Sequence, residues 1–313
     1  MVAGQAPVSR CAIGAAMSTD IFAIPRGDVR YPATLDAIHD PPQTLLIRGN
    51  ADALCAPSVA IVGSRAASPY ALEVARRLGA DLARRNVAIV SGMARGVDSA
   101  AHRGALEAGG VTIAVFGCGV DIIYPPEHRA LADRILERGA LVSEHPAGMP
   151  PLPHHFPKRN RIISGLSLAV VVVEAAEGSG SLITADLALE QGRTVLAVPG
   201  NVLGGRNYGA HALLRDGAKL VECADDILEE LPLGLRAEGI RLSEAKGSKE
   251  LSSASQDPVL RAMDEGDAYD LDEISERSGV DRMKLLPRLL ELELAGALRR
   301  IDGGRFVRFR RPC

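Results

Sequence analysis

Short apolar runs alternate along the chain with longer stretches in which apolar residues recur every three or four positions, from Tyr31 to about Leu231. The runs are rich in Val, Ile and Ala, and they are continuously apolar, as expected of strands that are buried on both faces. They lie at Val59–Val62, Val87–Val90, Thr112–Phe116, Leu141–Val142, Ala169–Val173 and Thr194–Val198. The stretches between them have the spacing of amphipathic helices, for example Pro69–Arg85, Ser99–Ala108 and Glu127–Arg138. The alternation predicts an α/β fold, with an open, mostly parallel sheet and helices on both faces.

The ends of the chain differ from this pattern. Residues 1–30 show little periodicity and are expected to form a flexible tail before a core at 31–232. Residues 233–255 are polar, contain Gly, Ser and Ala, and are interpreted as a linker. Residues 256–313 then form a separate small unit.

The small unit has the pattern of a winged helix. A helical stretch starts at Asp272 and turns at Gly279, and a second helix runs through Leu285 to Leu294 and closes at Gly296. The segment Leu298–Val307 predicts a hairpin with a Gly-Gly turn. Acids and bases are about equal in number here, whereas a helix that reads duplex DNA is usually more basic. A protein-contact or regulatory role is therefore preferred to duplex readout.

Composition narrows the function classes. The chain has 313 residues, 47% of them hydrophobic, which is enough for real cores and excludes wholesale disorder. A formal net charge of −3 gives no global sign of a polyanionic partner, and aromatics at 3% with no Trp argue against a broad stacking platform. Composition alone would suggest a metabolic enzyme.

The sequence also bears on compartment and metals. The N-terminus lacks the pattern of a signal peptide, and the longest apolar run, Leu168–Val173, is too short to span a bilayer. The five cysteines are scattered and form no CxxC, so neither a disulfide framework nor a zinc site is expected. A cytoplasmic protein without metal or cofactor is the expectation.

Glycine, serine and arginine follow the predicted strands, where an open parallel sheet binds its ligands. Glycine lets backbone N–H groups approach an anion, and each following helix adds a positive N-terminus. The residues in question are Gly63, Ser64, Arg65 and Ser68 after the first strand, Gly92 and Arg95 after the second, Gly117 and Gly119 after the third, and Ser179, Gly180 and Ser181 after the fifth. Glycines at such turns can serve geometry alone, but their convergence on one rim favours an anion site.

Two common nucleotide-binding motifs, the P-loop and the dinucleotide-binding glycine motif, are absent. The chain has no GxxxxGK[ST], and Gly63-Ser64-Arg65 is not GxGxxG, which disfavours a dinucleotide enzyme. Ser68 followed by Pro69 predicts a helix N-cap and first helical residue, which leaves Arg65 on the loop facing the crevice. A structural ion pair is the alternative role for Arg65.

A basic segment carries the second candidate. Residues 154–161 contain three fixed positive charges, no acid and one aromatic ring. Flanking prolines predict an extended loop that enters a helix near Arg159. Phe156 could stack on a base, with Lys158, Arg159 and Arg161 following phosphates and Asn160 donating and accepting hydrogen bonds. Solvated surface is the alternative.

Three further residues, Asp98, His102 and Cys118, have structural interpretations that are preferred to a catalytic role. Asp98 and His102, four apart, could be an acid/base pair, but Asp98 is expected to cap a helix that begins at Ser99, with His102 packed on its first turn. Cys118 lies between glycines without a neighbouring base and is interpreted as a packing residue.

Seven ordered blocks resemble the DNA-processing protein A family (DprA/Smf). They are GSRAASPYA, SGMARGVDSAAHRGAL, GCGVDIIYPPEHRAL, SEHPAG, FPKRNRIISGLS, EAAEGSGSLITADLALEQGRTVLAVPG and LLRDGAKLV, within about residues 31–231. The resemblance implies a Rossmann-like core, and the 256–313 unit is similar to the winged helix that many members carry. Most members also have a helical domain before the core, which appears here as missing or vestigial.

The resemblance implies a single-stranded DNA-binding protein rather than an enzyme. Members protect incoming strands in natural transformation, help to load the RecA recombinase, and act as homodimers. Matched by motif, Gly63, Ser64, Arg65 and Ser68 would contact phosphate, and the FPKRNR segment would supply stacking and charge. The chain departs from the family at Gly209-Ala210-His211, where GTN is usual, and at Ala71, where glycine is usual; neither change removes a charge from the site.

Two other classes stay open. The core also resembles nucleoside-monophosphate glycosidases, and Glu190 follows Gly178–Thr184 as a possible catalytic glutamate, although the PGG of that motif is absent. The third class is an adaptor that recruits RecA and has no DNA affinity of its own.

Overall fold

The computed structural model describes residues 20–232, 257–264, 267–294, 298–300 and 305–308. The core comprises residues 20–232, and the C-terminal unit comprises the remaining described residues. Within these residues, no helix combines the length and the apolarity needed to cross a membrane.

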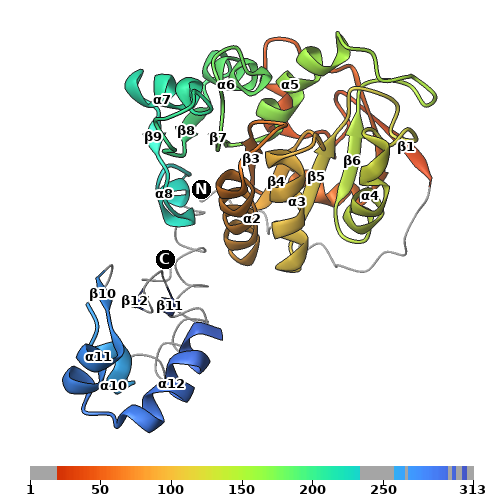
Figure 1. Cartoon of the computed structure of the whole chain (residues 1–313). Coiled ribbons are helices and arrows are strands. Elements are labelled where there is room, and N and C mark those ends of the chain that lie inside the picture. The colour runs from red at the N-terminus through yellow and green to blue at the C-terminus, as the bar shows by residue number, and fades with distance from the viewer. Residues whose placement is uncertain (1–19, 233–256, 265–266, 295–297, 301–304, 309–313) are drawn as a thin grey trace, which may run out of the picture.

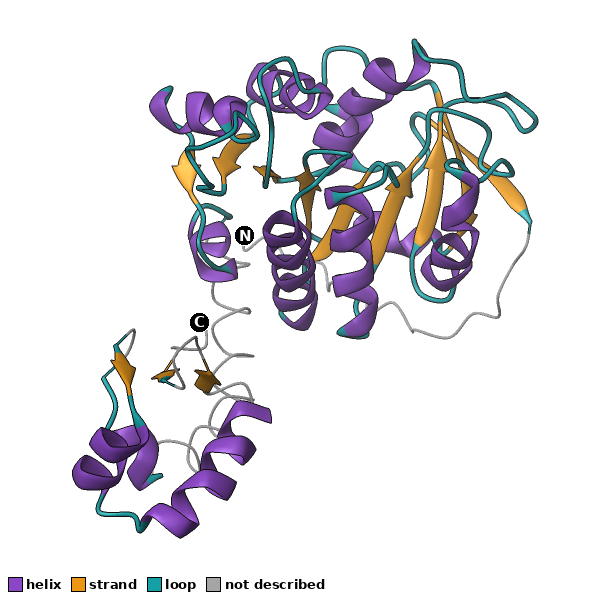
Figure 2. Cartoon of the chain, in the orientation of Figure 1, coloured by secondary structure: helices purple, strands orange, loops and turns teal. Residues whose placement is uncertain are grey.

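The core is built on one nine-stranded sheet (Figures 1 and 2). Its strands are β1 (Ile21–Pro25), β2 (Thr44–Gly49), β3 (Ser58–Val62), β4 (Ala88–Ser91), β5 (Thr112–Val115), β6 (Ala140–Ser143), β7 (Ala169–Val172), β8 (Thr194–Ala197) and β9 (Lys219–Leu220). Their order is β1-β2-β6-β5-β4-β3-β7-β8-β9. The pairs β1–β2 and β2–β6 are antiparallel, and all other neighbours are parallel. The predicted open, mostly parallel sheet is confirmed.

Helices cover both faces of the sheet (Figure 1). They are α1 (Ala33–Asp36), α2 (Pro69–Arg84), α3 (Val97–Glu107), α4 (Arg129–Leu136), α5 (His155–Leu166), α6 (Gly180–Glu190), α7 (Tyr208–Arg215) and α8 (Ala224–Glu229), with 3₁₀ helices at Ala51–Cys55 and Pro126–His128. Side chains alternate along each strand. In β7, Val170 and Val172 pack with α1, α5 and α6, whereas Val171 packs with α2, α3 and α8.

The first strands differ from the sequence-based expectation. Ile21–Pro25, inside the stretch interpreted as a tail, forms β1, and Ile24 is fully buried. Thr44–Gly49, which was not among the predicted strands, forms β2 with Leu45 and Ile47 in the core. Both are edge-side antiparallel strands with one buried face, so their alternating pattern is weaker than the continuous runs of the parallel strands.

The strand order reverses direction between β3 and β7. The chain builds β3 to β6 toward one edge and then returns across the sheet to β7, β8 and β9 on the other side of β3. The loops after β3 and β7 therefore diverge, and a cavity lies at the carboxyl ends of these strands, the usual ligand position in such sheets.

The C-terminal unit combines short helices with a small sheet. Its elements are α10 (Pro258–Arg261), β10 (Ala268–Tyr269), α11 (Leu271–Ser278), α12 (Arg282–Leu294), β11 (Leu298–Arg300) and β12 (Phe306–Arg308). The strands pair antiparallel in the order β10-β12-β11. Gly279 ends α11 in the left-handed conformation at φ 69°, which confirms the predicted turn. The predicted stop at Gly296, the Gly-Gly turn and the linker lie outside the described residues.

Candidate nucleic-acid interface

The loop after β3 is fixed by its glycine and by the backbone of the next strand. A Cβ at Gly63 would lie 2.7 Å from Val97 Cγ2 and 3.0 Å from Glu174 O, so a side chain has no room. Ser64 N donates to Glu174 O (2.7 Å), and Ser64 O accepts from Val97 N (3.2 Å). The loop therefore holds together the starts of the segments that follow β3, β4 and β7.

Ser68 caps α2 as predicted. Its Oγ accepts from Ala71 N at 3.2 Å, and Pro69 is the first helical residue. The same hydroxyl donates to Glu174 Oε2 at 2.6 Å, and Ser68 N donates to both oxygens of that carboxylate. The Ser68 hydroxyl is thus engaged inside the fold, and donating to a phosphate would require giving up its bond to Glu174.

Arg65 and Phe156 meet across a small crevice between the β3–α2 loop and the first turn of α5, which Gly92, Arg95 and Tyr124 also line. The Arg65 guanidinium lies 5.7 Å from the centroid of the Phe156 ring, within the range of a cation–π contact. Tyr124 flanks the same ring, with centroids 5.5 Å apart. Arg65 is exposed and Phe156 is partly exposed, so the structure brings together a cation and a ring that are separated by some ninety residues of sequence.

The basic segment is a helix rather than an extended loop. α5 begins at His155, so Phe156, Pro157 and Lys158 form its first turn. Pro157 is tolerated in the first turn because the N–H groups there have no helical partner. The prolines around the segment therefore did not reveal that the helix begins at His155 rather than near Arg159. Helical spacing then sends the basic residues in different directions: Lys158 is exposed, but Arg159 is buried.

Arg159 points into the protein, and its expected role as a DNA contact is not supported. It is 4% exposed and donates through Nη1 to the carbonyls of Gly92 (2.8 Å) and Val115. Burial lowers the pKa of Arg159 to about 10, an effect that the Asp98 carboxylate opposes. A Cβ at Gly92 would lie 2.5 Å from the guanidinium nitrogens, so the glycine makes room for this side chain.

Asp98 completes this buried arrangement. Its Oδ2 accepts from Gly92 N (3.0 Å) and Ala94 N (3.3 Å). The predicted cap is wrong, because α3 begins at Val97 and its N-cap is Gly96 at φ 76°, where an L side chain would be strained. Together, Arg159 and Asp98 hold the loop after β4 against the first turns of α5.

His102 does not pair with Asp98. Its Nδ1 lies 2.6 Å from Thr112 Oγ1, and this hydroxyl donates its own hydrogen to Ile89 O. His102 must therefore donate from Nδ1, which leaves its buried Nε2 without a proton or a partner among the described residues. Burial lowers the pKa of His102 to about 3, so this residue is a neutral core histidine.

The other residues of the basic segment are engaged with neighbours. Asn160 Nδ2 donates to Gly180 O (3.3 Å) and links α5 to the start of α6. Arg161 forms ion pairs with Asp40 (3.0 Å) and Glu144 (2.7 Å), so its charge is balanced locally. Neither side chain is as available to a strand as the sequence suggested.

The remaining rim residues shape the crevice. Arg95 pairs with Glu127, and a Cβ at Gly117 would lie 3.1 Å from Phe156 Cδ1. Gly119 leaves room for Asp121 and the carbonyl of Pro146. Ser179 caps α6, and its Oγ lies 2.8 Å from that of Ser181. Cys118 is buried and donates to Ile122 O; burial raises its pKa to about 11, as suits a packing residue.

Two contributors were missed by sequence reasoning. Tyr124 beside Phe156 gave no signal because it lies in an irregular segment between β5 and α4. Glu174 lies two residues after the end of β7, at the reversal of strand order, and is 2% exposed. The sequence signal for Glu174 was a carboxylate at the end of a predicted buried strand.

Comparison with known proteins agrees with this geometry. The profile described as "DNA recombination-mediator protein A" matches residues 22–232, and the "DprA winged helix domain" matches residues 243–304. The chain belongs to the DNA recombination-mediator protein A family. It is 45% identical over 296 residues to Protein Smf of Escherichia coli K12, covering 93% of this chain and 78% of the relative. It is 46% identical over 200 residues to DprA of Streptococcus pneumoniae R6, covering 64% and 71%.

Solved structures of family members share the fold. DprA from Streptococcus pneumoniae matches with a TM-score of 0.66 and 44% identity, over 68% of this chain and 75% of that one. DprA from Helicobacter pylori matches with a TM-score of 0.61 and 29% identity, over 68% and 97%. The latter structure is described as giving insight into a single-stranded DNA binding mode. The Rossmann-like core and the winged helix expected from the resemblance are thus confirmed.

Proposed function

We propose that this protein binds single-stranded DNA in the crevice between the β3–α2 loop and the first turn of α5, protects the incoming strand, and helps to load the RecA recombinase during natural transformation and recombination. The observation that carries the proposal is the Arg65–Phe156 contact, with Lys158 exposed two residues along α5. The single-stranded DNA binding mode described for the Helicobacter pylori relative supports it.

The chemistry of the crevice suits a strand without a fixed sequence. A base stacks on Phe156 through its π-face, which every base has, and Arg65 and Lys158 attract the phosphates on either side. Stacking and phosphate contacts carry no sequence information, so binding is nearly sequence-blind. Duplex DNA is disfavoured because its bases are already stacked on one another.

The charge count of the crevice is smaller than the sequence suggested. Arg159 is buried, Arg161 is paired with two carboxylates, and Arg95 is paired with Glu127. Among the described residues, Arg65 and Lys158 have no ion-pair partner. For single-stranded DNA, each phosphate that the protein neutralises adds about −0.7 to the slope of log K against log salt. Two phosphate contacts therefore predict a slope of about −1.4 per crevice. If Arg159 and Arg161 had contacted phosphates as the sequence suggested, the slope would be steeper.

A direct test uses the purified full chain without any partner protein. Fluorescence anisotropy is measured with a labelled oligo-dT and with a duplex of equal length. The proposal predicts preferential single-strand binding that is weakened in Lys158→Ala and unchanged in Lys219→Ala, an exposed lysine at the sheet edge. No single-strand affinity in the absence of RecA would instead favour the adaptor class.

Partner and assembly states are part of the same proposal. RecA loading, a homodimer joined through the core, and a cytoplasmic location rest on family membership and on the predicted single-strand binding. Light scattering of the purified chain tests the dimer. The rate of RecA filament formation on strands already coated with a single-strand binding protein tests loading, and no acceleration would count against it.

The winged helix is proposed to contact a protein or to regulate the core, within a domain taken as 256–313 after a linker at 233–255. On α12, Arg288 pairs with Asp257 and Glu291, and Arg282 pairs with Asp272. Leu286 and Leu290, one helical turn apart, are more than half exposed. Arginines that are already ion-paired, next to exposed leucines, favour contact with a protein over contact with duplex DNA. Loss of duplex binding in full-length Lys284→Ala would contradict this.

An enzymatic role gains no support from the placement of Glu190. This residue is the last of α6 and is exposed, whereas the crevice lies at the N-terminus of the same helix. Eleven residues at about 1.5 Å each place the two ends roughly 16 Å apart. Release of free base from nucleoside monophosphates, abolished by Glu190→Gln, would overturn this conclusion.

A further inference from the structure

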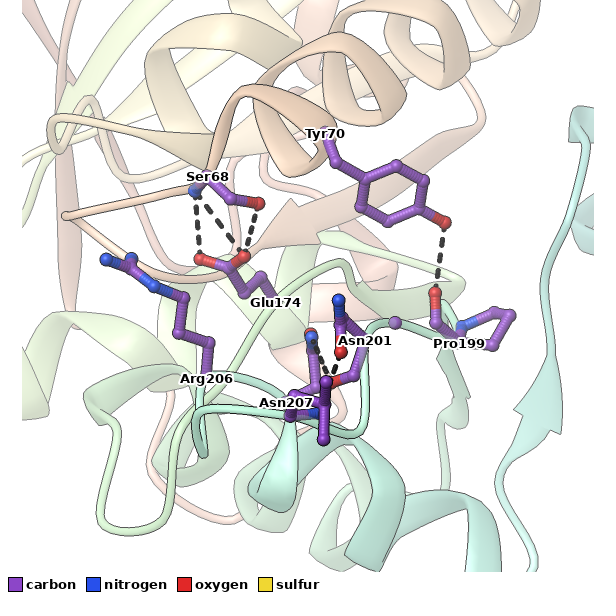
Figure 3. Close-up of a pocket in the computed structure, with 9 residues that line it drawn as sticks. Ser68, Tyr70, Glu174, Pro199, Asn201, Arg206 and Asn207 are labelled. Atoms are coloured by element: carbon purple, nitrogen blue, oxygen red, sulfur yellow. Dashed lines mark hydrogen bonds between the residues drawn. The ribbon is translucent and has the colours of Figure 1, made fainter.

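A second cavity lies on the other side of the β3–α2 loop from the Phe156 crevice. It has a volume of about 630 Å³ and opens at the carboxyl ends of β3, β7 and β8. Figure 3 shows Ser68 and Glu174 on one side of it, with Tyr70, Asn201 and Arg206 around the space. This volume is within the range of small-molecule sites, and the location is the reversal point of the strand order.

One wall of the cavity offers a flat ring. Tyr70, in the first turn of α2, is 52% exposed, and its hydroxyl donates to Pro199 O at 3.0 Å. This hydrogen bond fixes the ring over the opening. Leu203, on the loop between β8 and α7, is 77% exposed at the same opening. A planar heterocycle would cover both apolar surfaces.

The opposite wall offers an uncompensated cation. Arg206 Nη1 donates to Ala66 O at 2.8 Å, and the guanidinium forms no ion pair with the residues that the structure describes. One hydrogen bond to a carbonyl leaves most of the five N–H donors of arginine available, in a fork that matches a phosphate. Arg206 is exposed, so a phosphate can approach it without entering the core.

The floor of the cavity supplies both a hydrogen-bond acceptor and a hydrogen-bond donor. The Glu174 carboxylate is held in place by Ser68 and is an acceptor at 2% exposure. Asn201 Oδ1 accepts from Leu203 N (2.7 Å), which turns its amide nitrogen into the remaining donor. Asn207 is packed against Gly200, where a Cβ would lie 2.4 Å from its amide, and closes the floor.

A ring, an anion-binding fork and a polar floor within one cavity match the parts of a nucleotide. We infer that this cavity binds one nucleotide, with its base on Tyr70 and its phosphate on Arg206. The shared β3–α2 loop supports this ligand class, since Arg206 holds the carbonyl of Ala66 next to the loop residue that faces Phe156. The nucleotide is either free or a unit of the bound strand, and only the second source rests on the proposed function.

The experiment uses the full chain and two probes. Binding of 1,N⁶-etheno-AMP is measured by fluorescence, and binding of a labelled oligo-dT by anisotropy. The variants are Tyr70→Leu, which removes the ring, and Arg206→Gln, which keeps one donor for Ala66 but removes the charge. Tyr70→Phe keeps the ring, and Arg215→Gln removes an exposed arginine at the end of α7.

Each outcome decides the inference. A loss of etheno-AMP affinity of tenfold or more in Tyr70→Leu and Arg206→Gln, with a smaller loss in Tyr70→Phe and no change in Arg215→Gln, establishes a site for a free nucleotide. No etheno-AMP binding, but weaker oligo-dT binding in the same two variants, assigns the cavity to a nucleotide of the strand. Unchanged binding of both probes overturns the inference. The proposed function is judged separately, because it is tested by Arg65→Ala and Lys158→Ala in the Phe156 crevice and fails if they leave oligo-dT binding unchanged.

Discussion

The guanidinium of Arg65 lies 5.7 Å from the centre of the Phe156 ring, which places a cation beside an aromatic ring near the carboxyl ends of the central strands. Arg65 comes from the β3–α2 loop and Phe156 from the first turn of α5. In the proposed function, the base and the phosphate of a strand therefore meet groups that belong to two different segments of the chain.

Removing the ring is expected to weaken single-strand binding. Stacking of a base on an aromatic side chain contributes about 1–3 kcal/mol, so Phe156→Leu is predicted to lower affinity by about five- to 150-fold. Phe156→Tyr keeps the ring and is expected to bind within about threefold of the wild type. Anisotropy with oligo-dT measures both. Equal affinity of Phe156→Leu and wild type would show that no base stacks there.

Replacing Arg159 is expected to unfold the core rather than to alter a DNA contact. Arg159→Met leaves the buried Asp98 carboxylate and the carbonyls of Gly92 and Val115 without their cation. Each buried carbonyl left without a donor costs about 1–3 kcal/mol of stability, and the double variant Asp98→Asn with Arg159→Met, which also removes the buried carboxylate charge, should recover part of the loss. Chemical denaturation measures the free energies of unfolding. A fully stable Arg159→Met protein with weak DNA binding would restore the role expected from the sequence.

Acid is expected to destabilise the core through His102. The pKa of this residue is about 3 in the folded protein, below its usual 6.5, because charging it requires a proton on a buried nitrogen without a partner. The unfolded chain therefore binds the proton first, and stability falls as the pH falls below 6.5. The contribution is about 2 kcal/mol between pH 7.5 and pH 5. His102→Asn keeps a donor toward Thr112, and denaturation curves at the two pH values should lose this difference. A pH dependence identical to wild type would contradict the assignment.

Two glycines of the rim are expected to respond differently to alanine. At Gly63, a Cβ would meet Val97 at 2.7 Å and the backbone of Glu174 at 3.0 Å, so Gly63→Ala should shift the loop that carries Arg65 and lower single-strand affinity. At Gly180, no atom lies within 4 Å of the added Cβ, so Gly180→Ala is the matched control and should bind as wild type. Equal single-strand affinities of the two variants would contradict this prediction, because they would show that close packing of the loop does not matter for binding.

The sequence predicted the central strands and the rim because continuous apolar runs and glycine-rich strand ends have direct physical meanings. It did not predict β1 and β2, whose single buried face gives a short and weak alternation. It placed Arg159 and Arg161 with Lys158, because sequence proximity cannot show that helical geometry sends one inward and pairs another with Asp40 and Glu144. The Arg65–Phe156 contact and the Arg206 cavity join distant segments, so only the folded chain reveals them.

Arg65 and Lys158 are proposed to bind the phosphates of a single strand. The most direct measurement is oligo-dT affinity across a series of salt concentrations, for wild type and for the double variant Arg65→Ala with Lys158→Ala. We expect a negative slope of log K against log salt for wild type, and for the double variant weaker binding and a slope shallower by about 1.4. A salt-independent affinity, or a double variant with the affinity and slope of wild type, would contradict it.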